Sequence, residues 1–311
     1  MPGAAILPPN KELSMRRRKF LQLLGITGGM AAMAPALGHV QWAVAAAGTN
    51  GRSSTSAIGV LHDSTLCIGC LCCETACAMA NGNPLPQRDP NDLSPLDKLR
   101  RTTVENFTVV NKYTPPGTER PIFRKQQCNH CQEPACAAAC FVKALAKNPN
   151  GPVTYDKSLC VGCRYCMIAC PYNVLAYSYH SALNPLVYKC SLCAHLLEKD
   201  QEPGCTSACP TGALLFGNRL ELLQLAKERI AEKPARYVSH VYGEHEVGGA
   251  NWLYLSPVAH KELDQPELAT TSAAELTAGT LATVPMIAGV WSVLLTGVYV
   301  FSKRMQKKED A

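Results

Sequence analysis

Residues 160–171 read Cys-Val-Gly-Cys-Arg-Tyr-Cys-Met-Ile-Ala-Cys-Pro, four cysteines spaced C-x2-C-x2-C-x3-C and followed by Pro171. Polypeptides hold [4Fe–4S] clusters with this spacing. The C-x2-C-x2-C loop folds three thiolates around three corners of one cubane. The fourth cysteine starts a helix that carries it to a corner of the other cluster of a pair. The stretch therefore predicts iron–sulfur chemistry, with ligands shared between separate parts of the chain.

Three more groups of cysteines accompany this run, and the four groups take up all of the 17 cysteines except Cys72. Group one repeats the same spacing, group two is C-x2-C-x4-C-x3-C, and group four is C-x2-C-x11-C-x3-C followed by a proline. In chain order the groups are Cys67, Cys70, Cys73 and Cys77; Cys128, Cys131, Cys136 and Cys140; Cys160, Cys163, Cys166 and Cys170; and Cys190, Cys193, Cys205 and Cys209. Four groups predict four [4Fe–4S] clusters and a conductor of single electrons. Cys72 is not needed for the spacing of group one, in which Cys73 is the third cysteine. We expect Cys72 to be a small buried residue rather than a ligand.

Disulfides and zinc are the two alternatives for so many cysteines. Exported proteins usually pair their cysteines, but disulfide frameworks rarely repeat C-x2-C-x2-C, and cysteines this close in sequence do not easily bridge each other. Tetrahedral zinc sites use two C-x2-C pairs rather than quartets that end in x3-C-P. The spacing favours iron–sulfur clusters over both.

The composition suits a loop-rich body whose core is partly inorganic. Aromatic residues make up 6% of the 311 residues, and the chain contains 22 glycines and 22 prolines. Because metal binding then contributes directly to folding, we expect a poorly folded apo form. The formal net charge of +6 resides in residues 1–47 and 303–311. The body between them is neutral and becomes acidic when each oxidised cluster adds about −2, which argues against nucleic acid as a partner.

The N-terminal residues 1–47 resemble a signal for export through the Tat pathway. Residues 16–22 read Arg-Arg-Arg-Lys-Phe-Leu-Gln, with a twin arginine before x-Phe-Leu. An uncharged stretch follows and ends in an alanine-rich run, residues 43–47, that offers A-x-A cleavage sites. Clusters are assembled in the cytosol, and threading would strip them, so an exporter of folded proteins suits this cargo. The alternative is an ordinary amphipathic helix.

The C-terminal residues 276–302 contain no charged side chain and are long enough to cross a bilayer. Four basic residues follow within residues 303–311. By the positive-inside rule, this end is cytoplasmic. We therefore predict a transmembrane anchor at 276–302 and a basic cytoplasmic tail at 303–311. The alternative is a buried helix of a soluble protein.

Between the two ends, residues 48–217 are predicted to form the cluster domain, with an insertion at 81–127, and residues 218–275 a C-terminal extension. Repeated cysteine-loop–helix units predict an α+β fold with two ferredoxin-like halves, each holding two clusters. In the extension, apolar residues at helical spacing predict an amphipathic helix over residues 220–231. Short strands are expected at residues 62–66, 107–110 and 153–156.

The residues around the cysteines resemble those of a known family. Residues 128–136 read Cys-Asn-His-Cys-Gln-Glu-Pro-Ala-Cys, and residues 203–213 read Pro-Gly-Cys-Thr-Ser-Ala-Cys-Pro-Thr-Gly-Ala. With the run at 160–171, these motifs resemble the four-cluster electron-transfer subunits of the DMSO reductase type over roughly residues 60–217. The leader, the anchor and Gly-Glu-x-Glu at 243–246 make the chain most similar to the HybA-like iron–sulfur subunits of membrane-bound uptake [NiFe]-hydrogenases.

The resemblance implies crossed ligation in four ligand sets. Set one would be Cys67, Cys70, Cys73 and Cys209; set two Cys77, Cys190, Cys193 and Cys205; set three Cys128, Cys131, Cys136 and Cys170; and set four Cys140, Cys160, Cys163 and Cys166. Ala78 and Phe141 depart from the family pattern, in which a proline often follows the last cysteine. This affects the local turn and leaves the ligands intact. The resemblance thus implies four cubanes and no three-iron cluster.

No catalytic constellation, P-loop or dinucleotide signature is present, so the chain is expected to be a non-catalytic electron-transfer subunit. The resemblance implies that electrons pass from the small and large subunits of a [NiFe]-hydrogenase through the clusters to a multi-span, HybB/NrfD-like membrane subunit that reduces quinone. The body would lie on the periplasmic face of the cytoplasmic membrane, with the C-terminus in the cytoplasm. His130 and His195, beside ligating cysteines, would either donate hydrogen bonds to cluster sulfur or serve packing and surface roles.

Two other functions remain open. The chain would be the iron–sulfur subunit of a molybdopterin oxidoreductase or of an NrfC/NrfD-type periplasmic respiratory complex, or it would be an iron–sulfur redox sensor. The iron–sulfur subunits of formate dehydrogenases are usually exported with the Tat signal of their catalytic partner, whereas this chain has a Tat signal of its own. A sensor predicts a labile cluster and a signalling domain, and no signalling domain is recognisable.

Overall fold

A computed structural model of the chain describes residues 57–86, 89, 91–181 and 186–309. The predicted signal peptide, residues 1–47, lies outside the described residues. The strands are β1 (Ile58–Asp63), β2 (Val109–Tyr113), β3 (Ile122–Gln126), β4 (Leu145–Lys147), β5 (Val153–Tyr155), β6 (Ala176–Tyr177), β7 (Val187–Tyr188), β8 (Leu214–Asn218) and β9 (Trp252–Leu255). The α-helices are α3 (Cys72–Asn81), α4 (Ala135–Ala138), α5 (Tyr165–Ala169), α6 (Ala194–Leu197), α7 (Gly204–Ser207), α8 (Arg219–Glu232) and α9 (Ala273–Glu309). Three short 3₁₀ helices are η1 (Ser94–Asp97), η2 (Glu246–Gly248) and η3 (His260–Leu263).

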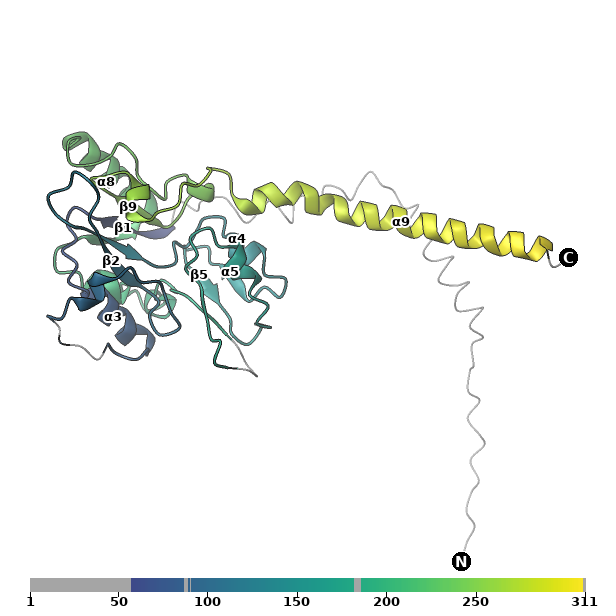
Figure 1. Ribbon diagram of the computed structural model, residues 1–311, viewed down its shortest axis with the longest axis horizontal. Helices are drawn as coiled ribbons and strands as arrows, with labels where there is room; N and C mark the ends of the chain where they lie inside the picture. The colour runs from purple at the N-terminus through teal and green to yellow at the C-terminus, as the bar shows by residue number, and fades with distance from the viewer. Residues whose placement is uncertain (1–56, 87–88, 90, 182–185, 310–311) are drawn as a thin grey trace, which may run out of the picture. The chain divides into compact units, whose positions relative to one another are not determined.

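A three-stranded sheet in the order β8-β1-β9 joins the beginning of the described chain to its C-terminal extension. Strand β1 pairs antiparallel with β8 and parallel with β9, with Val60 opposite Trp252. Successive side chains of a strand point to opposite faces. Leu61 accordingly packs with Leu222 and Ala226 of α8, while Val60 packs into the core that contains the cysteines. Figure 1 shows α8 beside β1 and β9.

Three two-stranded antiparallel sheets complete the β structure: β2-β3, β4-β5 and β6-β7. Strands β2 and β3 form in the insertion at 81–127, and β3 leads into cysteine group two. Strand β5 leads into group three, and β7 leads into group four. The architecture is therefore mixed α and β, with each of these cysteine loops entered from a strand.

The structure confirms the amphipathic helix expected over residues 220–231. Helix α8 begins after Asn218, whose side chain accepts a hydrogen bond from the amide of Leu220 at 2.8 Å, as an N-cap does. The strand expected at 153–156 is β5. The strand expected at 62–66 is shifted: β1 ends at Asp63, whose carboxylate accepts hydrogen bonds from the amide and hydroxyl of Thr65 and turns the chain. The strand expected at 107–110 likewise lies later, in β2.

Helix α9 contains a stretch long and apolar enough to cross a membrane, Thr283–Gln306, and its most apolar window is not buried by the protein. Large apolar side chains such as Trp291, Leu295 and Phe301 are exposed along it. The helix continues through residues 303–309, so the expected tail begins as helix. Pro285 lies inside the helix, as is tolerated in membrane helices.

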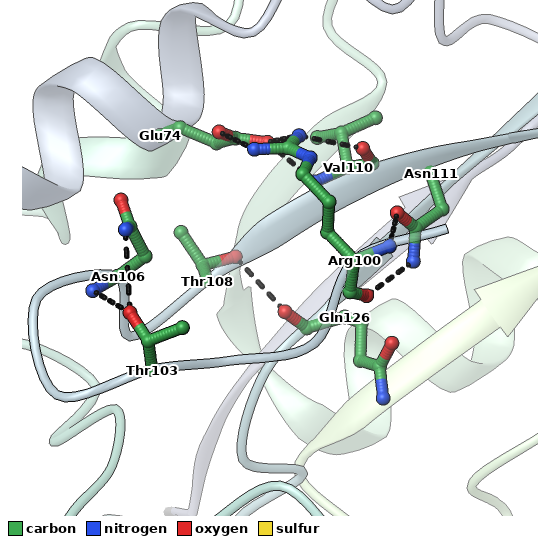
Figure 2. A network of polar contacts seen from close by, with 8 residues as sticks. All are labelled: Glu74, Arg100, Thr103, Asn106, Thr108, Val110, Asn111 and Gln126. Carbon is green, nitrogen blue, oxygen red and sulfur yellow. Dashed lines mark hydrogen bonds and ion pairs between the residues drawn. The ribbon is translucent and has the colours of Figure 1, made fainter. Parts of the chain in front are cut away.

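A buried ion pair fastens the insertion to the helix that carries Cys73 and Cys77. Glu74 of α3 accepts hydrogen bonds from both terminal nitrogens of Arg100, at 3.0 and 2.6 Å, and from the amide of Val110 at 2.6 Å. Arg100 and Asn111 also exchange two hydrogen bonds between side chain and backbone (Figure 2). The network holds β2 against α3.

Replacing Glu74 with Gln is expected to lower the free energy of unfolding by about 3 kcal/mol, because Arg100 would lose its charge partner in a buried site. The measurement is the urea concentration at which the cluster absorbance is lost. The matched control is Glu232→Gln at the exposed end of α8, which is expected to change the free energy by no more than about 0.5 kcal/mol. Equal shifts in the two variants would contradict this role of Glu74.

Candidate iron–sulfur cluster sites

The fold brings cysteine group one to group four, and group two to group three. Helix α3, which carries Cys73 and Cys77, packs against α7, which carries Cys205. The approach is close: a Cβ added at Gly204 would lie 3.0 Å from the backbone oxygen of Ala76. Helix α4, with Cys136, packs against α5, with Cys166. Figure 1 shows α4, α5 and β5 grouped together.

All four C-x2-C loops share one backbone feature, a left-handed residue directly before the second cysteine. The residues are Gly69 (φ 71°), His130 (φ 48°), Gly162 (φ 71°) and Leu192 (φ 56°). Glycine adopts this conformation freely, whereas His130 and Leu192 adopt it at a steric cost. Such strain persists where the surrounding structure demands it and is common at ligand sites. The repeated turn shows that the four groups share one local geometry.

One cavity is lined by all four members of set one, Cys67, Cys70, Cys73 and Cys209. The same cavity is lined by His62, Lys125 and apolar side chains. The fold therefore brings the distant Cys209 to the same cavity as three cysteines of group one.

The pKa values of the buried thiols report which cysteines lie near one another. Burial raises the pKa of Cys67 to about 11, and Cys70 and Cys209 add to the rise. Burial raises the pKa of Cys77 to about 12, and its thiol neighbours are Cys205 and Cys193. Members of group one thus lie near members of group four: Cys67 near Cys209, and Cys77 near Cys193 and Cys205.

The second pair of groups behaves in the same way. Burial raises the pKa of Cys131, with further contributions from Cys128, Cys136 and Cys170. Burial also raises the pKa of Cys166 to about 11, and its thiol neighbours are Cys140, Cys160 and Cys163. The neighbours fall into the same sets three and four.

Contacts between sets run in one order. The thiol of Cys205, in set two, contributes to the raised pKa of Cys73, in set one. Cys128 of set three acts on Cys190 of set two. Cys166 of set four acts on Cys136 of set three. Neighbouring thiols thus connect set one with set two, set two with set three, and set three with set four.

The donor chemistry fits iron–sulfur clusters. All 17 cysteines lie in the described residues and all are free thiols, so none is in a disulfide. Within the described ranges, no three His, Cys, Asp or Glu side chains are close enough together to hold a single metal ion. Soft sulfur donors alone, four to a set, match the ligands of a [4Fe–4S] cluster. Because the thiolate is the form that binds the metal, cluster binding releases the protons of these thiols.

His130 is buried beside Cys131, whereas His195 is exposed. His130 is fully buried, and its Nδ1 accepts a hydrogen bond from the amide of Val153 at 2.9 Å. Burial lowers the pKa of His130, so the ring is neutral and carries its hydrogen on Nε2. That atom has no partner among the described residues. His195 is exposed on α6.

The prediction that Cys72 is buried is wrong, because its side chain is exposed. Cys73 and Cys77, four residues apart on α3, share the buried face of the helix. Cys72 lies off that face, and its Sγ is 3.8 Å from the carbonyl oxygen of Cys70.

Sequence reasoning missed two polar residues of the set-one cavity, His62 and Lys125. His62 is 1% exposed, and neither ring nitrogen has a hydrogen-bond partner among the described residues. Burial, helped by Lys125, lowers the pKa of His62 to about 3, so the ring is neutral. The alternation of β1 places His62 on the same face as Val60, a signal that was available in the sequence. For Lys125 the sequence offered no such signal.

Known proteins match most of the chain. The model of a 4Fe-4S dicluster domain matches residues 120–219. The chain is 51% identical to a protein of Nitratidesulfovibrio vulgaris over 94% of its own length and 78% of that protein. It is 37% identical to the hydrogenase-2 operon protein HybA of Escherichia coli O157:H7, over 82% of the chain and 84% of HybA.

A third relative is the iron–sulfur subunit of the nitrate-inducible formate dehydrogenase of Escherichia coli strain K12. The identity is 36%, over 70% of the chain and 72% of that subunit. The chain belongs to the family of 4Fe-4S iron–sulfur subunits that includes these proteins. As a member of the 4Fe-4S dicluster family, it is an iron–sulfur electron-transfer subunit.

Proposed function

We propose that the chain holds four [4Fe–4S] clusters and relays electrons from a periplasmic [NiFe]-hydrogenase to a quinone-reactive membrane subunit. The observation that carries the proposal is the arrangement of the thiols. Thiols from two groups of the sequence lie near one another in each of four places, which supports four sets of four cysteines. The proposed ligands are Cys67, Cys70, Cys73 and Cys209; Cys77, Cys190, Cys193 and Cys205; Cys128, Cys131, Cys136 and Cys170; and Cys140, Cys160, Cys163 and Cys166.

In this proposal, the packed pairs α3–α7 and α4–α5 are the centres of two ferredoxin-like halves, each with two clusters. Bound clusters would supply one-electron transfer, and no covalent bond in the protein would change. The polypeptide fixes the clusters in order and keeps water away from them. Lys147 shows how the loops are held, since its ammonium donates hydrogen bonds to the carbonyl oxygens of His130, Cys131 and Gly151 and so fixes the loop of group two.

The two end sets are proposed to face the partner proteins. Ile68 and Val161 directly follow the first cysteine of groups one and three, and their exposed fractions are 57% and 60%. At the same position of group two, Asn129 is buried, and Ser191 of group four is half-buried. Exposed apolar side chains beside sets one and four therefore mark the places where another subunit would cover the molecule.

The hydrogenase assignment rests on the extent of the relationship to HybA. Identities to HybA and to the formate dehydrogenase subunit are nearly equal, but the former covers 82% of the chain and the latter 70%. The second candidate is therefore a molybdopterin enzyme such as formate dehydrogenase as the electron donor. With either electron donor, the electron acceptor would be a HybB/NrfD-like membrane subunit.

The proposed location is the periplasmic face of the cytoplasmic membrane. The apolar stretch Thr283–Gln306 of α9 supports an anchor there, and the basic residues after Ser302 favour a cytoplasmic C-terminus. Residues 1–47 would direct export of the folded, cluster-loaded protein through the Tat pathway.

Metal analysis of the detergent-solubilised complex, purified through this chain, tests the assignment. Nickel at about one atom per complex is expected, together with iron above the roughly 16 atoms that four cubanes contain. Molybdenum or tungsten without nickel would overturn the hydrogenase assignment and support the second candidate. Iron well below 16 atoms per chain would overturn the four-cluster proposal itself.

A further inference from the structure

Three lysines lie deep among the cysteine loops, and one of them differs from the other two. Lys147 donates to three carbonyl oxygens, and Lys189 donates to the carbonyl oxygens of Val153 and Cys190. Lys125, at 2% exposure, donates a single hydrogen bond, to the side chain of Gln127 at 3.1 Å. Lys147 and Lys189 thus hold the backbone in place. The ammonium of Lys125 keeps further N–H groups that donate no hydrogen bond among the described residues.

No carboxylate forms an ion pair with Lys125 in the described part of the chain. Its ammonium lies 4.4 Å from the centroid of the Trp252 ring, which supplies only a weak cation–π attraction. An uncompensated buried charge is strongly unfavourable. We therefore expect a negatively charged group to lie next to the Lys125 ammonium in the functional protein.

The residues around Lys125 indicate which negatively charged group this is. Lys125 lines the same cavity as set one, Cys67, Cys70, Cys73 and Cys209. The cysteines that act on it most strongly are Cys205, Cys73, Cys190 and Cys77. Three of these belong to set two and one belongs to set one. Lys125 consequently lies where the first two ligand sets meet.

We propose that Lys125 is a fixed positive charge shared by the first two clusters, and that it raises the midpoint potential of both. The inference rests on the proposed ligand sets. Reduction adds one negative charge to a cluster, and a nearby cation in a water-poor interior stabilises the reduced form more than the oxidised form. The unused N–H donors of Lys125 are available to cluster sulfur in the cavity.

The test is a redox titration, followed by electron paramagnetic resonance, of the purified complex that carries Lys125→Met. Methionine is unbranched like lysine and only one atom shorter, and it suits the apolar face of Trp252, but it removes the charge. The midpoint potentials of two of the four clusters are expected to shift to more negative values, and the other two to stay. The matched control is Lys112→Met on β2, a half-exposed lysine paired with Asp97, which is expected to leave all four unchanged.

Four clusters with unchanged potentials in Lys125→Met would overturn this inference and leave the ligand sets standing. Fewer than four clusters in the wild-type protein would instead overturn the proposed sets. If Lys125→Met lost iron, Lys125→Arg would decide the matter. Arginine keeps the charge, so retention of iron and of the wild-type potentials supports the proposal. Potentials in Lys125→Arg that fall, or a loss of iron equal to that of the methionine variant, would overturn it.

Discussion

Replacing Cys77 and Cys193 together with serine is expected to remove about four iron atoms per chain, no more than either replacement alone. The two cysteines lie far apart in sequence, but both belong to set two, and Cys193 is a thiol neighbour of Cys77. Loss of one ligand removes the whole cubane. Loss of a second ligand of the same cubane therefore removes no further iron. Iron and acid-labile sulfide per chain are the quantities to measure.

Replacing Cys73 and Cys77 together gives the opposite expectation, a loss of about eight iron atoms, because the proposed ligand sets assign these near neighbours to different clusters. Non-additive effects reveal shared sites and additive effects reveal separate ones. Cys72→Ser, one residue from Cys73 and exposed, is the matched control and is expected to keep all the iron. Additive loss from Cys77 and Cys193, with non-additive loss from Cys73 and Cys77, would show that each group binds its own cluster.

Removing the clusters with an oxidant and a chelator is expected to unfold the body. Six buried cysteines, Cys73, Cys128, Cys136, Cys166, Cys190 and Cys205, are members of the main core. A structural metal site contributes on the order of 10 kcal/mol to the folding of a small domain, as much as the whole stability of many domains. The iron-free body is therefore expected to have no stable folded state.

The measurement is near-ultraviolet circular dichroism in detergent, together with the rate of tryptic cleavage. Loss of the aromatic signal is expected, because Trp252, Tyr172 and Tyr254 pack in the same core as the cysteines. Cleavage is expected to accelerate roughly tenfold or more as the open state becomes populated. Refolding with iron and sulfide should restore both. A native aromatic signal in iron-free protein would show that polypeptide packing alone maintains the fold.

The local features of this protein were predictable from its sequence. Cysteine spacing predicted the loops, and apolar spacing predicted α8. The parallel pairing of β9 with β1 was not predictable, because Trp252–Leu255 is apolar throughout and its pattern does not say which distant strand it joins. Lys125 was missed for a related reason: a lysine in a short strand normally faces water, and only the packing of β3 against Trp252 buries it.

The pairing of β9 with β1 has a consequence for the order of events in the cell. Strand β1 is the first described element to leave the ribosome, and one of its two neighbours, residues 252–255, emerges only after all four cysteine groups. Until then one edge of β1 has no partner from its own sheet, and such edges are prone to pair with other chains. The β8-β1-β9 sheet therefore becomes complete late in translation. A polypeptide cut short before residue 252 carries every cysteine group with its central sheet still open.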